Sequence, residues 1–546
     1  MPVAVGTGGR EFLNENQARI MKIKRNWAQS WRLIILLLWA LPAAVQAQFT
    51  FTTNNGAITI TGYTGSDGSM VIPAMTNGFP VTSIGTKAFY EDSYLTNISI
   101  PNGVTTIGDF AFVYTSLGSV TIPDSVTSIG NGVFWNCGGL RSVTFGSSVT
   151  NIGNAADPVG VFGLTALTNV IIPNSVVSIG TLAFQAIGSL TNVTFGNSVT
   201  TLAEEAFIGS GLTSLTLPNS VTNIGVSAFM YCNSLKNVTL GTGVTTVGSK
   251  AFYECSILSN VTILGPVPNF GDNAFYGCSN LTSLTLGNGV STIGNSAFQN
   301  CTSLTNFTIP SNVTNIGAYA FANTHMTNLV VPLSAGNNIG DGAFSGNSYL
   351  TSVILSTNMT YIGNYLFAGC GFLTNVIIPD TVTSIGTNAF AGCPFLANVT
   401  IAGSVTNIAD GAFYGSGRNG QFYFEGNAPT MGANVFGGLI FSFPFKWTLY
   451  YLPGATGWSN PFYGSTAILW NPQAQTGDGF FGVRTNRFGF NITGSSNVML
   501  VVEASTNLVN PVWQALGTYT LSNAPVYFSD AQWTNYPGRY YRFRSP

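Results

Sequence analysis

The sequence has few charged residues and a single histidine. Of its 546 residues only 7% are Asp, Glu, Lys or Arg, whereas an ordinary soluble domain has about 25%. The formal net charge is -2, so the chain as a whole has no field that would attract nucleic acid. A single histidine, His325, rules out a metal site with two histidine ligands and makes a Ser-His-Asp triad a remote prospect. We therefore expect no nucleic-acid partner, no metal site and no cofactor.

Long apolar runs are also missing. The apolar stretch at residues 33–41 follows several basic residues and is far shorter than the roughly 20 residues that cross a bilayer. Val45-Gln46-Ala47 supplies a small-residue cleavage pattern. We predict a signal peptide over residues 21–47, with residues 1–20 upstream of the true start; a membrane-anchored helix is the alternative. The mature chain is then expected to contain no membrane span and to be secreted or displayed on a bacterial cell surface.

The sequence is instead rich in one repeat, which a Phe marks in each copy. Of the fifteen intervals between successive copies, eleven are 23 residues, three are 22 and one is 28. The long interval contains residues 154–160, which we expect to form a loop. The sixteen residues are Phe89, Phe112, Phe134, Phe162, Phe184, Phe207, Phe229, Phe252, Phe275, Phe298, Phe321, Phe344, Phe367, Phe390, Phe413 and Phe436. Such a period is typical of a repeat architecture.

Each copy carries two apolar motifs. In one copy, Leu212-x-x-Leu215-x-Leu217 has the spacing of a short strand, and Val221-x-x-Ile224 leads into a return path. Gly225 is expected to permit a tight turn, followed by a short helical turn at the Phe. One copy cannot bury enough apolar surface to fold alone, but stacked copies share their cores. The predicted fold is a repeat solenoid of about 16 units of 22–23 residues, each a β-strand plus a turn or short helical return.

The pattern changes near residue 440. Residues 49–440 contain five Lys/Arg against fourteen Asp/Glu, whereas residues 441–546 contain six against three. Short strand-like segments separated by turn residues follow residue 473. We predict an N-terminal cap over residues 48–80, the solenoid over 81–440, a C-terminal cap or linker over 441–472, and a small all-β, β-sandwich-like module over 473–546.

The repeat carries a family resemblance. The pattern LTSVTIPxSVTSIGxxAFxxC over about residues 70–440 resembles the BspA-type leucine-rich repeat of bacterial surface and secreted proteins. Residues 59–85 resemble the N-terminal cap of that family, and VVEASTNLVNPVWQAL with YYRFRSP resembles C-terminal β-modules of exported bacterial repeat proteins. The resemblance implies a leucine-rich-repeat solenoid used in adhesion, surface display or partner capture. It implies no catalytic residues.

The cysteines share one place in the repeat. Each lies three residues after the repeat Phe, at Cys137, Cys232, Cys255, Cys278, Cys301, Cys370 and Cys393. Stacked side chains at equivalent positions point in parallel, which is poor geometry for a disulfide. We therefore favour a buried ladder of free thiols over disulfides.

The charged residues offer weaker candidates. Four aspartates lie three residues before the repeat Phe, where we expect them to cap the helical turn: Asp109, Asp272, Asp341 and Asp410. Glu204 and Glu205 are adjacent carboxylates in the repeats, but neighbouring residues on a turn usually diverge, so catalysis there is a minor hypothesis. Three arginines alternate with aromatic residues near the C-terminus and are expected to face solvent on a strand edge: Arg539, Arg542 and Arg544.

The outward positions of the repeated strand are the main candidate surface. Stacking should align them into parallel columns of hydroxyls and amides that can hydrogen-bond sugars or peptide backbone; the alternative is that they only solvate the sheet. The candidate ligand-binding residues are Thr191, Asn192, Thr194, Thr213, Ser214, Thr216, Asn237, Thr239, Asn260, Thr262, Thr282, Thr285, Asn306 and Thr308.

These features together predict an exported, nonenzymatic recognition or adhesion protein. Its expected partner is an extracellular protein or polysaccharide bound through the repeat surface. A passive structural component of a cell envelope or matrix is the alternative, and a carbohydrate-active enzyme using Glu204 and Glu205 is a less favoured one.

Overall fold

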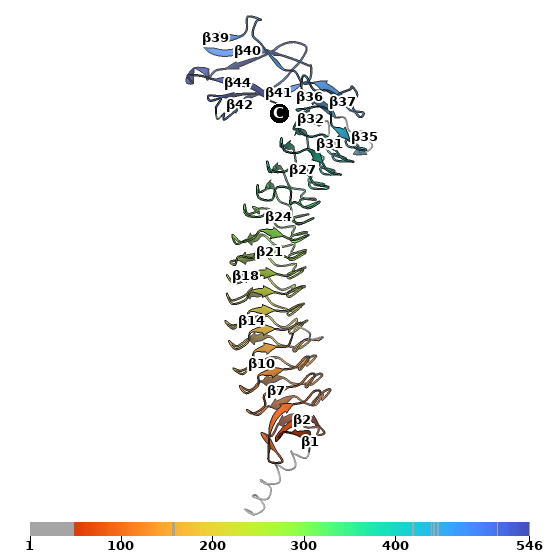
Figure 1. Ribbon diagram of the computed structural model, residues 1–546, viewed down its shortest axis with the longest axis vertical. Helices are drawn as coiled ribbons and strands as arrows, with labels where there is room; N and C mark the ends of the chain where they lie inside the picture. The colour runs from red at the N-terminus through yellow and green to blue at the C-terminus, as the bar shows by residue number, and fades with distance from the viewer. Residues whose placement is uncertain are drawn as a thin grey trace, which may run out of the picture. The chain divides into compact units, whose positions relative to one another are not determined.

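The computed structural model describes residues 48–154, 159–417, 420–437, 439–440, 443–444, 447–509 and 511–544. The chain forms two compact units, residues 1–176 and 177–546, each described here by itself (Figure 1). The predicted upstream segment 1–20, the signal peptide 21–47 and residues 155–158 of the predicted loop lie outside the described residues. In the described ranges no helix is both long enough and apolar enough to cross a bilayer.

The first unit contains a six-stranded sheet, in which β1-β2-β5-β7-β9 are neighbours in that order and β4 pairs with β5, and the two-stranded sheets β3-β6 and β8-β10. The β1–β2 pair is antiparallel, and from β2 to β5 onward the pairing is parallel. Its strands are β1 (Phe49–Asn54), β2 (Ala57–Tyr63), β3 (Ser69–Val71), β4 (Met75–Thr76), β5 (Phe79–Ile84), β6 (Asn97–Ser99), β7 (Thr106–Ile107), β8 (Ser119–Thr121), β9 (Ser128–Ile129), β10 (Ser142–Thr144), β11 (Asn151–Ile152) and β12 (Asn169–Ile171).

The second unit has two strands in most of its rungs, a rung being one copy of the repeat. The longer strands are β14 (Asn192–Thr194), β16 (Ser214–Thr216), β18 (Asn237–Leu240), β20 (Asn260–Ile263), β22 (Ser283–Thr285), β25 (Asn328–Val330), β26 (Ser352–Ile354), β28 (Asn375–Ile378), β30 (Asn398–Ile401), β32 (Gln421–Phe424), β36 (Thr448–Tyr451) and β37 (Thr466–Leu469). The shorter strands are β13 (Ser178–Ile179), β15 (Thr201–Leu202), β17 (Asn223–Ile224), β19 (Thr246–Val247), β21 (Asn269–Phe270), β23 (Thr292–Ile293), β24 (Asn315–Ile316), β27 (Tyr361–Ile362), β29 (Ser384–Ile385), β31 (Asn407–Ile408) and β33 (Thr430–Met431).

The C-terminal part of the second unit is antiparallel. Its sheets are β38-β40-β39 with β43 on β40, and β42-β41-β44. The remaining elements are the pair β34 (Leu439–Ile440) and β35 (Phe443–Pro444), then β38 (Gln473–Gln475), β39 (Gly482–Arg484), β40 (Arg487–Thr493), β41 (Met499–Ser505), β42 (Gln514–Thr520), β43 (Val526–Asp530), the 3-10 helix η1 (Trp533–Asn535) and β44 (Tyr540–Arg544).

A continuous column of aromatic rings forms the centre of the repeats. Phe252, Phe275 and Phe298 are fully buried, and their rings stack 5.0 and 5.4 Å apart between centroids. This distance is close to the spacing of hydrogen-bonded strands, about 4.8 Å, so ring stacking and strand pairing have the same repeat distance. The predicted solenoid and its Phe register are therefore confirmed.

The return path is a run of turns, and not the expected helical turn. Ser227 and Tyr231 have positive φ values of 55° and 60°, so the N–H groups alternate in direction along the chain. Those of Ser227, Phe229 and Tyr231 donate to carbonyls 22 residues later, in the next rung, whereas the N–H of Met230 donates back to Ser227. A helix would direct all of them along its own axis and lose this third inter-rung ladder.

The aspartates and glycines expected at this turn have different roles from those predicted. Asp272 Oδ1 accepts the N–H of Asn295, one rung later, at 2.7 Å, and Asp341 does the same for Asn364; neither caps a helix. Gly225 has no positive φ. A Cβ there would lie 2.6 Å from the carbonyl carbon of Ala203 in the preceding rung, so glycine is needed for close stacking.

The cysteines form the predicted buried column of free thiols. The Cys278 thiol donates to the Phe252 carbonyl at 3.2 Å. Other copies place a different donor here, and Asn347 Nδ2, for example, donates to the Phe321 carbonyl at 2.8 Å. Burial raises the pKa of Cys232 to about 11. The position therefore requires a small side chain that can satisfy a buried carbonyl.

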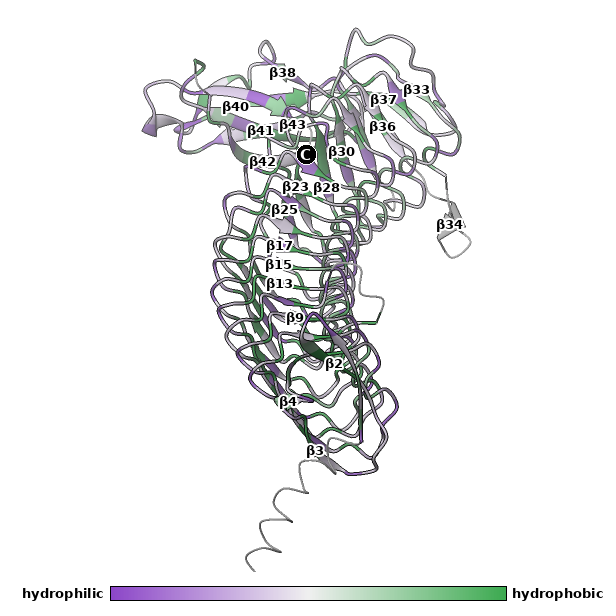
Figure 2. Cartoon of the chain, turned by 60° about the horizontal axis from the view of Figure 1, so that its bottom comes forward, coloured by the Kyte–Doolittle hydropathy of each residue, from purple (hydrophilic) through white to green (hydrophobic). Residues whose placement is uncertain are grey.

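The strand sheet of the repeats continues past residue 440 and supports the C-terminal sheets. The parallel order β28-β30-β32-β36-β37 runs through the predicted cap, and Tyr423 and Tyr450 pack into one buried cluster with residues such as Phe490 and Leu500. The Tyr450 hydroxyl also donates to the Asn497 carbonyl at 2.8 Å. Figure 2 shows the antiparallel strands lying beside β28, β30 and β36. The domain boundaries themselves remain predictions.

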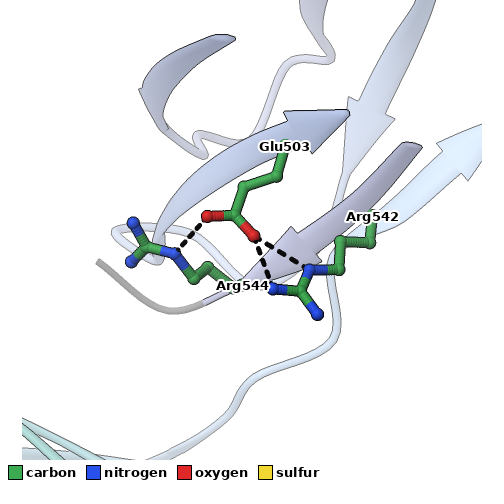
Figure 3. Close-up of polar contacts among 3 residues, drawn as sticks. All are labelled: Glu503, Arg542 and Arg544. Atoms are coloured by element: carbon green, nitrogen blue, oxygen red, sulfur yellow. Dashed lines mark hydrogen bonds and ion pairs between the residues drawn. The ribbon is translucent and has the colours of Figure 1, made fainter. Parts of the chain in front are cut away.

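Arg542 and Arg544 lie on the edge strand β44 with side chains 46% and 43% exposed, as expected, whereas the side chain of Arg539 is only 5% exposed. Arg542 and Arg544 on β44 both donate to the buried carboxylate of Glu503 on β41, at 2.8 and 2.7 Å (Figure 3). Burial of Glu503 favours its neutral form, but the hydrogen bonds and charges of Arg544 and Arg542 outweigh this effect, so the pKa of Glu503 is lowered. Arg539 pairs with Asp530 at 3.0 Å. The ion pairs with these two carboxylates hold the arginine side chains against the sheets.

Replacing Phe275 by Ala should lower the free energy of unfolding by about 3–5 kcal/mol, because it opens a cavity in the ring column. Phe372→Ala is the matched control, since Phe372 is 49% exposed, and should cost less than about 1 kcal/mol. Guanidinium denaturation followed by circular dichroism measures both. Equal losses would contradict the idea that the ring column carries the stability.

All seven cysteines should resist Ellman's reagent at pH 8 in the native protein, because each is buried and burial raises the thiol pKa, as for Cys137 and Cys232. All seven should react after denaturation. Rapid reaction of any thiol in the folded chain would show that its rung opens or is misplaced.

Replacing Glu503 by Gln should reduce both stability and its dependence on pH. The folded pKa of Glu503 is lowered, so its ionised form stabilises the fold above the unfolded value of about 4.3, and this contribution is lost as the pH falls below it. We expect the substitution to cost about 2 kcal/mol at pH 7 and less at pH 3. Thermal melting at both pH values tests this, with Glu254→Gln as an exposed carboxylate control. An equal cost at both pH values would refute it.

Candidate functional site

The outward side chains of the longer strands form three columns along the second unit. The first column is the residue before each strand, and the second and third are the outward residues within it. Ser214, Asn237 and Asn260 are in register in the second column, and Thr216, Thr239 and Thr262 in the third. As predicted, the candidate residues are exposed or half-exposed, while the aliphatic residues between them are buried. Whether they bind a ligand remains a prediction.

Many polar groups of the first two columns already bond within the solenoid. The Thr213 and Thr282 hydroxyls donate to the carbonyls of Thr191 and Ser259, at 3.3 and 3.2 Å. Asn260 Nδ2 donates to Asn237 Oδ1 at 2.8 Å. These contacts support the view that the first two columns mainly stabilise the stack.

The third column differs, because four of its threonine hydroxyls are not used in this way. Thr216, Thr239, Thr262 and Thr285 have no side-chain hydrogen bond within the part of the chain that the structure describes. Each hydroxyl can donate one hydrogen bond and accept two. The third column is therefore the outward position at which a ligand would compete only with water.

One of the candidate rungs lacks the longer strand. Residues 305–308 form no strand, although Asn306 and Thr308 are exposed as predicted. Phe307 occupies the place of the usual aliphatic residue, and its ring lies 6.5 and 5.6 Å from those of Phe298 and Phe321.

Beyond this rung the third column becomes apolar, which the sequence analysis missed. Val330, Ile354 and Ile377 are 54%, 64% and 72% exposed, and Val330 is in register with Ile354. Exposed apolar residues that adjoin one another are less usual than isolated ones. Comparing this single position across copies, where Thr is replaced by Val or Ile, would have revealed the change.

A second exposed ladder, of aromatic rings, lies before the same strands. Tyr349, Phe372 and Phe395 are 52%, 49% and 58% exposed. Neighbouring rings stack 6.1 and 5.6 Å apart with interplanar angles of 20° and 4°. Their π faces therefore contact one another, and their edges face solvent.

The apolar part of the third column lines a groove. A cavity of about 720 Å³ over β26 and β28 is lined by Ile354 and Ile377, among others. A second cavity of about 410 Å³ reaches Tyr423 and Arg542 at the C-terminal sheets. The two share Ile377, Thr400 and Glu425, so they form one continuous groove, and both volumes are those of ligand pockets.

Two carboxylates border the groove. Asp380 and Glu425 both line the larger cavity, and neither has an ion-pair partner among the residues the structure describes. Burial and the nearby charge of Asp380 raise the pKa of Glu425. Like charges held together favour binding of a cationic group.

The C-terminal sheets enclose a further cavity of about 670 Å³. Its lining is mainly aromatic and includes Phe488, Trp513 and Tyr541. Arg542 lies 4.4 Å above the Trp513 ring, but its charge is already paired with Glu503. The cavity is therefore largely apolar in character.

Glu204 and Glu205 do not belong to a larger acidic cluster among the described residues. Glu204 is exposed, and Glu205 is half-buried with a φ of 54°. Within the described ranges, no group of three or more His, Cys, Asp or Glu residues could hold a metal ion. The favoured surface is therefore the groove.

Comparison with known proteins identifies the repeat. A family model described as the BspA type leucine rich repeat region (6 copies) matches residues 75–156, 158–282, 222–347, 268–393 and 326–440. No curated protein matches the chain.

Solved bacterial proteins share the repeat. A leucine-rich repeat protein from Bacteroides ovatus is 24% identical with a TM-score of 0.54, covering 78% of this chain and 98% of its own. A leucine rich cell surface protein from Faecalibacterium prausnitzii is 28% identical (TM-score 0.37; 67% and 90% covered). The pneumococcal vaccine antigen PcpA is 20% identical (TM-score 0.34; 74% and 92% covered). The first of these has the same fold, and since the family model spans most of the residues, this chain belongs to the BspA-type leucine-rich repeat family.

Proposed function

We propose that the chain is an exported recognition or adhesion protein that binds an extracellular protein through the strand surface of its C-terminal repeats. The observation that carries this proposal is the change of the third column from Thr to the exposed residues Val330, Ile354 and Ile377, of which Ile354 and Ile377 line a groove. Burying one such side chain in a complex contributes about 1.5–3 kcal/mol. A contiguous exposed apolar strip of this kind is typical of a protein interface.

A protein ligand accounts for this surface better than a polysaccharide does. Sugars pack their C–H faces against the flat face of an aromatic ring, but the rings of Tyr349, Phe372 and Phe395 are stacked on one another. The surface that remains consists of ring edges and branched aliphatic side chains, which suits apolar side chains of a polypeptide. The free hydroxyls of Thr216, Thr239 and Thr262 would extend this surface with hydrogen bonds to peptide groups.

Family membership and the sequence support export to the cell surface or beyond. The predicted signal peptide at residues 21–47 and the neutral composition fit this location. A passive structural role is the second candidate and would involve self-association without a soluble ligand. Catalysis by Glu204 and Glu205 has no additional support from their surroundings.

The test is to bind the full chain to a panel of extracellular proteins and polysaccharides. We expect reproducible binding to a protein, and we expect Ile377→Asp to weaken it at least tenfold, which is about 1.4 kcal/mol. Ile171→Asp is the matched control, because Ile171 is 71% exposed in the same strand position but has Thr144 in the neighbouring strand position. It should leave binding unchanged.

Three results would count against the proposal. Binding to polysaccharides alone would replace the protein ligand, and equal effects of Ile377→Asp and Ile171→Asp would place the interface elsewhere. If the chain binds no member of the panel and self-associates in sedimentation measurements, the structural role is favoured.

A further inference from the structure

The groove continues a contact that the chain already makes with itself. Tyr423 and Tyr450 occupy the third column in register with Thr400, and both are buried beneath the C-terminal sheets. The next apolar members of the column, Ile377 and Ile354, have the same orientation but are uncovered. The exposed strip is therefore an extension of an established interface along the same strand surface.

The charges around the groove differ from one end to the other. Asp380 and Glu425 border its middle without ion-pair partners among the residues the structure describes. At the end near β44, Arg542 and Arg544 both pair with the carboxylate of Glu503. A basic group on a ligand is thus attracted to the middle of the groove.

We infer that the groove binds an extended polypeptide segment whose basic side chain, Lys or Arg, lies between Asp380 and Glu425 while flanking apolar side chains cover Ile354 and Ile377. This inference rests on the proposed function and specifies its ligand.

The length of the segment follows from the strand spacing. The groove crosses β26, β28, β30 and β32, whose three separations of about 4.8 Å give roughly 14 Å. An extended chain rises about 3.3 Å per residue, so four or five residues span it. The carboxylates would select the basic residue, and the apolar strip would provide most of the affinity.

The test is selection of a displayed library of random dodecapeptides on the full chain, with sequencing of the enriched peptides. We expect a Lys or Arg flanked within two residues by Val, Ile, Leu or Phe. The double variant Asp380→Asn with Glu425→Gln should lower binding of the selected peptides at least tenfold. The control is Glu204→Gln with Glu205→Gln, which changes the net charge equally and should alter binding less than twofold.

The outcomes separate this inference from the proposed function. Enriched peptides that need Ile377 but contain no basic residue, or whose binding survives loss of Asp380 and Glu425, would overturn the inference and keep the proposed function. Enriched peptides that are insensitive to Ile377→Asp, or no enrichment at all, would overturn both. Equal weakening by the control variant would show that only overall charge matters, and would also overturn the inference.

Discussion

The structure depends on a single repeat distance that two different interactions share. Strands paired in a sheet lie about 4.8 Å apart, and the stacked rings of Phe252, Phe275 and Phe298 are 5.0 and 5.4 Å apart. Each rung can satisfy both only if it has the same backbone path as its neighbours. Gly225 provides the close approach that this requires, and a thiol or other small donor, such as that of Cys278, satisfies the buried Phe carbonyl.

The same constraint leaves the outward columns free to vary. A side chain in the third column points away from the core of its rung, so the equivalent position can hold Thr262, Ile354 or Ile377. Recognition can therefore change along the chain without any change in fold. This independence explains why a family with a uniform core can present different surfaces.

The core could be predicted because it is periodic. The groove could not be predicted, because it departs from the repeat. The Phe and Cys positions follow from counting, and their burial follows from stacking. Of the two predicted forms of the return path, the structure has the turn and not the short helix, because the alternating φ values at Ser227 and Tyr231 direct hydrogen bonds to another rung, which local propensity does not encode. Asp380 and Glu425 lie 45 residues apart in sequence and meet only in the folded solenoid.

The C-terminal sheets show what an apolar third column does when a partner covers it. Tyr423 and Tyr450 stack 5.0 Å apart and are buried by β-strands of the same chain, with the Tyr450 hydroxyl bonded to the backbone of Asn497. The column therefore already serves as a docking surface for polypeptide within this protein. Ile377 and Ile354 extend it across rungs that no part of the described chain covers. Without a partner these side chains contact water, and removing them from water is favourable. A second polypeptide with apolar side chains at the same spacing would therefore be stabilised on Ile377 and Ile354 in the same way as the C-terminal sheets are stabilised on the tyrosines.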